Sequence, residues 1–185
     1  MALPLEDNKN DAASPADDSR IKGNLPPKVK HMLDSVLHEL MARPNVFGAA
    51  IGERIDITEA SIVPKVEESS RSEARVVCEV TVAEDMLNPE GSLHGGCAAF
   101  LIDACTTLVF LAAARCAGVS ATMNIVYHAP AAPGAKLRIV NSAIAMGARI
   151  MSARSEIWDD TAKRLCVTGV HIKMEPSAPK QKQKL

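Results

Sequence analysis

The segment from Cys97 to Cys116 constrains the fold of this chain more than any other part of the sequence. It is apolar almost throughout, and its strongly polar side chains are Asp103, Thr106, Thr107 and Arg115. A helix that is apolar on every face is buried either in a protein core or in a membrane. The length of this segment alone permits a membrane span.

An aspartate near the middle of the segment argues against the membrane. On insertion scales, a carboxylate such as Asp103 costs about 2.5–3.5 kcal/mol at the centre of a transmembrane helix. The segment is also rich in Ala, Cys and Thr rather than in Leu and Ile. We therefore predict no membrane span but a core helix from about Gly95 to Ala117, closed by Gly118.

The flanking segments predict one further helix and six strands. Residues 26–43 begin with two prolines and carry apolar residues at spacings of three and four, the pattern of an amphipathic helix. Alternating apolar residues predict strands in 54–66 and 73–85. Turn residues separate four more predicted strands, which lie in 119–129, 136–146, 149–159 and 163–174.

This order of elements predicts the fold class. Several antiparallel strands that follow one central helix are typical of an α+β domain. A sheet curled around the apolar helix would bury that helix completely. We expect this domain over residues 27–174, preceded by a disordered acidic leader, 1–26, and followed by a polar basic tail, 175–185.

Composition narrows the partners and the compartment. A net charge of −1 and an aromatic content of 3% argue against nucleic-acid binding. The five cysteines are scattered and odd in number, which favours free thiols in a reducing, cytoplasmic setting. The final residues "QKL" weakly resemble a peroxisomal address, so a peroxisomal or mitochondrial location stays open as an alternative. His94 and Cys97 have no second ligand pair at metal-binding spacing, so no metal site is predicted.

Asp103 requires an explanation if its helix is buried. A carboxylate in a core is costly unless it is paired, hydrogen-bonded or protonated. Neighbouring hydroxyls, those of Thr106 and Thr107, would satisfy a purely structural aspartate. No basic residue lies within a helical turn of Asp103, however, which makes a functional role the alternative.

The start of the same helix has the features of an anion site. Gly95 and Gly96 would place free N–H groups and the positive end of the helix dipole at an accessible surface. Such a terminus could bind a phosphate or a developing oxyanion. Gly95 lies about 12 Å from Asp103 at about 1.5 Å per residue. A single carbonyl cannot contact both, so joint catalysis would require Asp103 from a second copy of the chain.

The stretch "NPEGSLHGG" that begins at Asn88, the acid Asp103, and the stretch "GVSATMNIVYHAPA" together resemble a known family. They are similar to the hot-dog-fold thioesterases of the phenylacetate-pathway and thioesterase superfamily member 2 type, over about residues 28 to 174. This resemblance implies a hot-dog fold, in which a curled antiparallel sheet wraps around one long central helix. It also implies hydrolysis of acyl-CoA to free acid and coenzyme A without a metal or redox cofactor. The implied assembly is a homodimer paired edge to edge, associating further as a dimer of dimers.

The resemblance implies a role for each matching residue. The Gly95 N–H would polarise the thioester carbonyl, and Asn88 would help to hold substrate or water. His94 would orient or polarise substrate rather than act as the main base. Asp103 would either activate water or attack the carbonyl itself, and Ser120 would orient the water.

The region that matches the coenzyme A site comprises Tyr127 and the turn at 145–150, with Gly147 and Arg149. Gly96 is a further candidate for substrate contact at the helix start. The turn lacks the lysine that the mammalian members carry, which leaves its nucleotide contacts open. We expect structural roles for His128, His171 and Trp158.

Two other functions remain open from the sequence. A hot-dog enoyl-CoA hydratase or dehydratase also combines a histidine with an acid, but it uses the histidine as the base. A non-catalytic acyl-CoA-binding dimer is the second alternative. The intact set of Asn88, Gly95, Asp103 and Ser120 favours hydrolysis over both.

Overall fold

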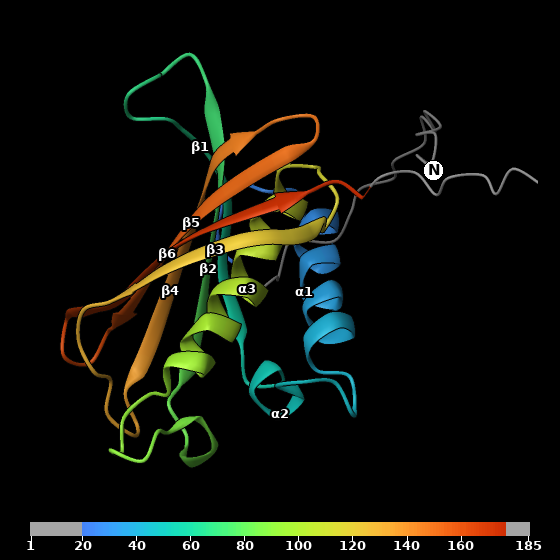
Figure 1. The fold of residues 1–185 in the computed structure, drawn as a ribbon. Helices are drawn as coiled ribbons and strands as arrows, with labels where there is room; N and C mark the ends of the chain where they lie inside the picture. The colour runs from blue at the N-terminus through green and yellow to red at the C-terminus, as the bar shows by residue number, and fades with distance from the viewer. Residues whose placement is uncertain (1–19, 177–185) are drawn as a thin grey trace, which may run out of the picture.

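The computed structural model describes residues 20–176, which form one antiparallel sheet wrapped around a long helix (Figure 1). The six strands lie in the order β1-β2-β4-β5-β6-β3, and all neighbouring strands are antiparallel. Their bounds are Asp56–Pro64 for β1, Ser72–Thr81 for β2, Val119–Tyr127 for β3, Lys136–Met146 for β4, Ile150–Asp159 for β5 and Arg164–Met174 for β6. The predicted α+β hot-dog architecture is confirmed, with each predicted strand in place.

The central helix α3 spans Gly95–Ala112 and supplies most of the core. It is long and apolar enough to cross a membrane, but 67% of it is buried inside the fold, as expected of a core helix. The predicted end near Ala117 is wrong. Ala114 adopts a left-handed φ of 55°, the Arg115 N–H donates to the Phe110 carbonyl, and the Ala114 N–H donates to the Leu111 carbonyl. These two bonds form a Schellman motif, which ends the helix well before Gly118.

Residues 20–26 correct the predicted domain boundary. The sequence predicts that they belong to the acidic leader, but the side chains of Ile21 and Leu25 are buried in the core. The Lys22 N–H donates to the Thr58 carbonyl, and the Lys22 carbonyl accepts from the Ala60 N–H. The folded part therefore begins before Pro27, because these residues cover the free edge of β1. Residues 1–19 of the predicted leader and residues 177–185 of the predicted tail lie outside the described residues.

Helix α1, Pro27–Met41, packs beside α3 on the side away from the sheet (Figure 1). Pro27 occupies its first turn, where the missing N–H has no intrahelical partner to lose. Leu33 and Leu37 face the core and are fully buried. Two short elements were not predicted, the helix α2 at Ala49–Gly52 and the 3-10 helix η1 at Glu84–Met86.

The second edge of the sheet is open within the described residues. Strand β3 pairs on one side with β6, and no described segment pairs with its other side. Most of its side chains are exposed, including Val119, Val126 and Tyr127. An unpaired edge strand presents a row of free N–H and C=O groups to another chain.

The packing of α1 on α3 predicts different costs for two leucines of the same helix. Leu37→Ala should lower the free energy of unfolding by about 2–5 kcal/mol, because Leu37 is 1% exposed. The control Leu40→Ala removes the same atoms from a side chain that is 44% exposed, and should change stability by less than about 0.5 kcal/mol. Urea denaturation of both variants measures the difference. Equal losses would show that α1 does not pack as described.

Candidate active site

The start of α3 is capped by His94, whose ring nitrogen Nδ1 accepts the Gly96 N–H at 2.9 Å. The His94 backbone is extended, with φ −64° and ψ 133°, and its N–H donates to the Met86 carbonyl. Because Nδ1 is an acceptor, the neutral ring carries its hydrogen on Nε2. His94 can therefore donate a hydrogen bond to a ligand. The N–H of Gly96 is already used in the cap, so Gly96 shapes the helix start rather than offering a donor to substrate.

Gly95 is the first residue of the helix, and its N–H makes no hydrogen bond within residues 20–176. Tyr127 lies over it from β3, and the tyrosine hydroxyl donates to the Gly95 carbonyl at 3.0 Å. Asn88 lies in the same open pocket of about 430 Å³, together with Gly95 and Tyr127. Its Oδ1 accepts from the Ser92 N–H at 2.9 Å, which leaves the amide NH₂ as a donor. The pocket at the helix start thus combines two donors, the Gly95 N–H and the Asn88 amide.

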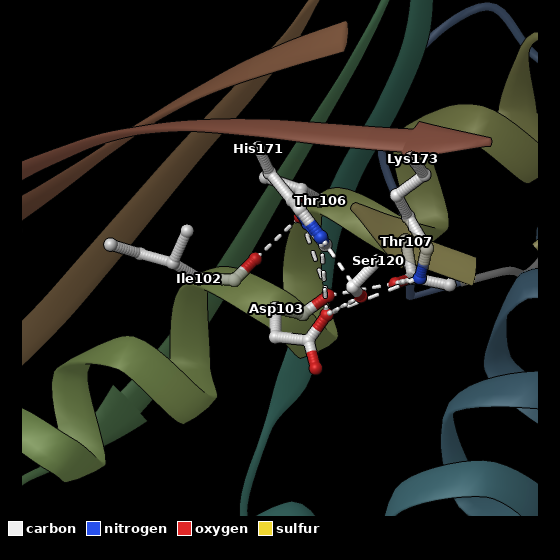
Figure 2. Close-up of polar contacts among 7 residues, drawn as sticks. All are labelled: Ile102, Asp103, Thr106, Thr107, Ser120, His171 and Lys173. Carbon is white, nitrogen blue, oxygen red and sulfur yellow. Dashed lines mark hydrogen bonds and ion pairs between the residues drawn. The ribbon is translucent and has the colours of Figure 1, made fainter. Parts of the chain in front are cut away.

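A second polar cluster surrounds Asp103 on the middle of α3 (Figure 2). The Ser120 Oγ of β3 lies 3.2 Å from Asp103 Oδ1. The His171 Nε2 of β6 lies 3.0 Å from Ser120 Oγ and 3.5 Å from Asp103 Oδ1. The Lys173 Nζ, two residues further along β6, lies 4.0 Å from the same carboxylate oxygen.

The sequence predicted that the sheet would bury α3 completely, and this prediction is wrong at Asp103. The Asp103 side chain is 44% exposed, whereas those of His171 and Lys173 are 0% and 7% exposed. The carboxylate therefore lies at the surface of the core, with buried partners behind it. Its cation comes from β6 and not from its own helix, which is why the helical sequence showed none.

Burial and charge set the protonation of the two β6 side chains. Burial lowers the pKa of the His171 imidazole below its ordinary value of 6.5; the Asp103 carboxylate opposes this shift and the Lys173 ammonium adds to it. Burial also lowers the pKa of Lys173, against the opposing effect of Asp103. At neutral pH, His171 is thus mainly a neutral ring.

The two clusters are separated along one helix. Gly95 and Asp103 are eight residues apart in α3, about 12 Å at about 1.5 Å per residue. The pocket at Gly95 is lined by neither Asp103 nor Ser120. A single chain therefore presents the donors and the carboxylate at two separate places.

The predicted coenzyme A turn lies at the other end of α3. Gly147 and Ala113 line one groove of about 500 Å³, together with the cationic residues Lys65 and Arg71. A Cβ on Gly147 would lie 2.6 Å from the Ile150 carbonyl oxygen, so the turn itself requires glycine. Arg149 is exposed in the same turn. Within one chain, Gly147 and Arg149 therefore lie near neither the Gly95 pocket nor the Asp103 cluster.

The sequence predicts a structural role for His171, but the structure places its Nε2 3.0 Å from Ser120 Oγ and 3.5 Å from Asp103 Oδ1, two predicted catalytic residues. The sequence carries one signal for it. The side chains of β6 that face the core alternate along the strand, at Val167, Gly169, His171 and Lys173. Cys166 is also buried but lies outside this alternation. Two ionisable residues on the core face of a strand need polar partners there. His128, by contrast, is exposed and contacts Thr168 on its neighbouring strand.

Comparison with known proteins agrees with this architecture. Residues 90–166 match the family model described as the thioesterase superfamily. The chain is 33% identical over 113 residues to acyl-coenzyme A thioesterase 13 of Mus musculus, a match that covers 60% of this chain and 81% of that relative. The zebrafish thioesterase superfamily member 2 structure has a TM-score of 0.67 at 25% identity, and covers 79% of this chain and 97% of that one.

The PaaI protein of the E. coli phenylacetic acid degradation operon shares the fold at 19% identity. Its TM-score is 0.57, and the match covers 80% of this chain and 93% of that one. The match to the mouse relative exceeds 30% identity over most of that protein's length, and the family model covers α3 and the strands β3, β4 and β5. The chain is a hot-dog-fold member of the thioesterase superfamily.

Proposed function

We propose that this protein hydrolyses acyl-CoA thioesters to free acid and coenzyme A, at an active site that two copies of the chain share. One observation carries the proposal: a pair of hydrogen-bond donors lies at the start of α3, and a solvent-accessible carboxylate lies on the same helix about 12 Å further along. Thioester hydrolysis needs both kinds of group at one carbon. The name of the mouse relative, an acyl-coenzyme A thioesterase, supports this substrate class.

The helix start supplies the electrophilic half of the site. The free N–H of Gly95 and the amide of Asn88 are donors at the positive end of the α3 dipole. A thioester carbonyl oxygen bound there would be polarised, and the oxyanion that forms on attack would be stabilised. Both donors are held in place before substrate binds, the first by the helix and the second by Ser92.

The Asp103 cluster supplies the other half. We assign Asp103 as the general base, because its carboxylate is exposed enough to meet water and Ser120 lies beside it. Asp103 takes a proton from water while the water oxygen bonds to the acyl carbon. The carbon–sulfur bond then breaks, and the proton passes from Asp103 to the thiolate of coenzyme A.

Strand β3 indicates how a second copy would complete the site. Ser120, at the start of β3, contacts Asp103, and Tyr127, at its end, contacts Gly95. Two copies of β3 paired antiparallel about a two-fold axis place the start of one strand beside the end of the other. Such a homodimer brings the Gly95 half of one copy to the Asp103 half of its partner. Further association into a dimer of dimers remains a prediction.

The geometry of His94 argues against the hydratase alternative. A histidine base needs a free ring lone pair, but His94 Nδ1 accepts the Gly96 N–H and the neutral ring carries hydrogen on Nε2. His94 is therefore a donor in its resting state. The exposed Asp103, with Ser120 beside it, provides the base that a purely binding protein would not need.

The donor role of Gly95 can be separated from its shape. Gly95→Pro deletes the N–H at the first helical position, where proline is well tolerated, and His94 already has the extended backbone that precedes proline. We expect kcat to fall by about 10²–10³-fold with little change in melting temperature.

Gly95→Ala is the matched control, because it keeps the N–H and places a Cβ at ordinary contact distance, 3.4 Å, from Tyr127. It should retain most of the activity. An equal fall in kcat in Gly95→Pro and Gly95→Ala would show that the Gly95 N–H has no role in the mechanism. Steady-state release of free thiol, measured beside thermal denaturation, provides both readouts.

The role of Asp103 predicts a specific loss of turnover. Asp103→Asn should lower kcat by about 10²–10⁴-fold and change KM little, because it removes the base and keeps the shape. Asp160→Asn, on an exposed hairpin, is the control and should behave like the wild type. Free-thiol release is followed over short, medium, long and aryl acyl-CoAs, beside hydration of an enoyl-CoA. Full turnover by Asp103→Asn, or hydration without thiol release by the wild type, would contradict the proposal.

A further inference from the structure

We propose that His171 is a positioning residue that takes the single hydroxyl hydrogen of Ser120, so that Ser120 and Asp103 both accept hydrogens from the attacking water. The inference deepens the proposed function and rests on it. It follows from counting hydrogens across the contacts between β6, α3 and β3 (Figure 2).

Two adjacent threonines of α3 receive the two buried side chains of β6 in the same way. The Thr107 hydroxyl donates to the Asp103 carbonyl at 2.7 Å and lies 2.8 Å from Lys173 Nζ. An ammonium group has only donors, so Thr107 accepts from Lys173. Thr106 repeats the pattern: its hydroxyl lies 2.6 Å from the Ile102 carbonyl and 2.7 Å from His171 Nδ1.

The hydrogen of Thr106 must lie on the carbonyl side. A carbonyl oxygen has no hydrogen, and 2.6 Å between two oxygens is a hydrogen-bond distance that only the Thr106 hydrogen can supply. Thr106 therefore accepts at its contact with His171. The hydrogen of that contact belongs to His171 Nδ1, and the neutral ring has a bare lone pair on Nε2.

This tautomer determines the direction of the Ser120 hydroxyl. Ser120 has one hydrogen and two acceptors nearby, His171 Nε2 at 3.0 Å and Asp103 Oδ1 at 3.2 Å. The bare lone pair of His171 takes this hydrogen, and the longer contact to Asp103 is left without one. A neutral His171 thus keeps the Asp103 carboxylate free of the Ser120 hydrogen.

The arrangement suits the attacking water. With its hydrogen on His171, the Ser120 oxygen is an acceptor, as is Asp103. A water that donates one hydrogen to each has its lone pairs turned away from both, toward the site of the acyl carbon. The hydrogen given to Asp103 is the one that transfers when the carbon–oxygen bond forms.

Protonation of His171 would reverse the direction of the hydrogen bonds between His171, Ser120 and Asp103. A second hydrogen on Nε2 donates to Ser120, whose own hydrogen then turns to Asp103 and weakens it as a base. The groups that face His171 are Asp103, Thr106 and the Phe110 ring on α3, Ser120 on β3 and Lys173 on β6. Burial lowers the pKa of His171. The neutral, active arrangement therefore persists to a pH below 6.5, and kcat/KM falls as the pH drops through this lowered pKa.

The first experiment reads the tautomer without any substrate. Long-range ¹H–¹⁵N correlation spectra of histidine-labelled full-length protein at neutral pH should show His171 with hydrogen on Nδ1 and none on Nε2. His171→Gln assigns the signals among the five histidines. Thr106→Val removes the acceptor and should move the hydrogen to Nε2, whereas the matched Thr107→Val should leave the His171 signals unchanged. A wild-type ring with hydrogen on Nε2 would overturn the inference.

The second experiment uses the pH dependence of thiol release. Thr106→Val should lower kcat by about 10–100-fold, by analogy with the loss found when the outer-shell hydrogen-bond partners of metal ligands are mutated. His171→Gln keeps an acceptor for Ser120 but cannot take a second proton, so its fall in kcat/KM should move to lower pH. His171→Leu has no acceptor and should be slower than His171→Gln at every pH.

If kcat/KM of His171→Gln falls at the same low pH as that of the wild type, the positioning role of His171 is overturned. A purely structural histidine would not determine the pH of this fall. The two experiments also separate this inference from the proposed function. A protein that releases no thiol from any acyl-CoA contradicts the function, while the tautomer is still decided by the spectra. Thiol release with the wrong tautomer contradicts only the role of His171.

Discussion

The packing of a nearly all-apolar helix into a curled sheet is the constraint on which the rest of this structure depends. The buried polar side chains of α3 need partners inside the fold, because 67% of the helix is buried there. Thr106 and Thr107 receive hydrogen bonds from His171 and Lys173 of β6, and Asp103 meets Ser120 of β3. The same contacts that satisfy the core thus hold the groups that we assign to catalysis.

The length of α3 has a further consequence. Its start presents donors and its middle presents a carboxylate, and about 12 Å of rigid helix keeps them apart. Rigidity excludes joint action within one chain, but it favours a two-fold arrangement in which each helix serves two sites. The open β3 edge, with Ser120 near one end and Tyr127 at the other, offers the surface for that arrangement. Residues 20–26 cover the β1 edge, which leaves β3 as the unpaired edge of the sheet within the described part of the chain.

The fold followed from the sequence because its patterns are local. Alternation and turn residues located all six strands, the spacing of apolar residues located α1, and a continuous apolar run located α3. The errors came from features that no local pattern carries. A Schellman motif formed at Ala114 without a glycine, and Ile21 and Leu25 joined the core from a stretch of acidic composition. The role of His171 depends on contacts with two elements far away in the sequence, so its type and strand position alone indicated only structure.

The division of the active site between two copies is the central claim, and a purified hybrid of two inactive variants tests it most directly. Chains carrying Gly95→Pro and chains carrying Asp103→Asn are co-expressed with different affinity tags, and the mixed dimer is isolated by sequential capture. In a shared site, the intact Gly95 of one chain meets the intact Asp103 of the other, so one of the two sites is restored. We predict that the hybrid recovers about half of the wild-type kcat per dimer, while each variant alone stays about 10²-fold or more below the wild type. A hybrid as inactive as its two parents, or the absence of any hybrid, would contradict the account.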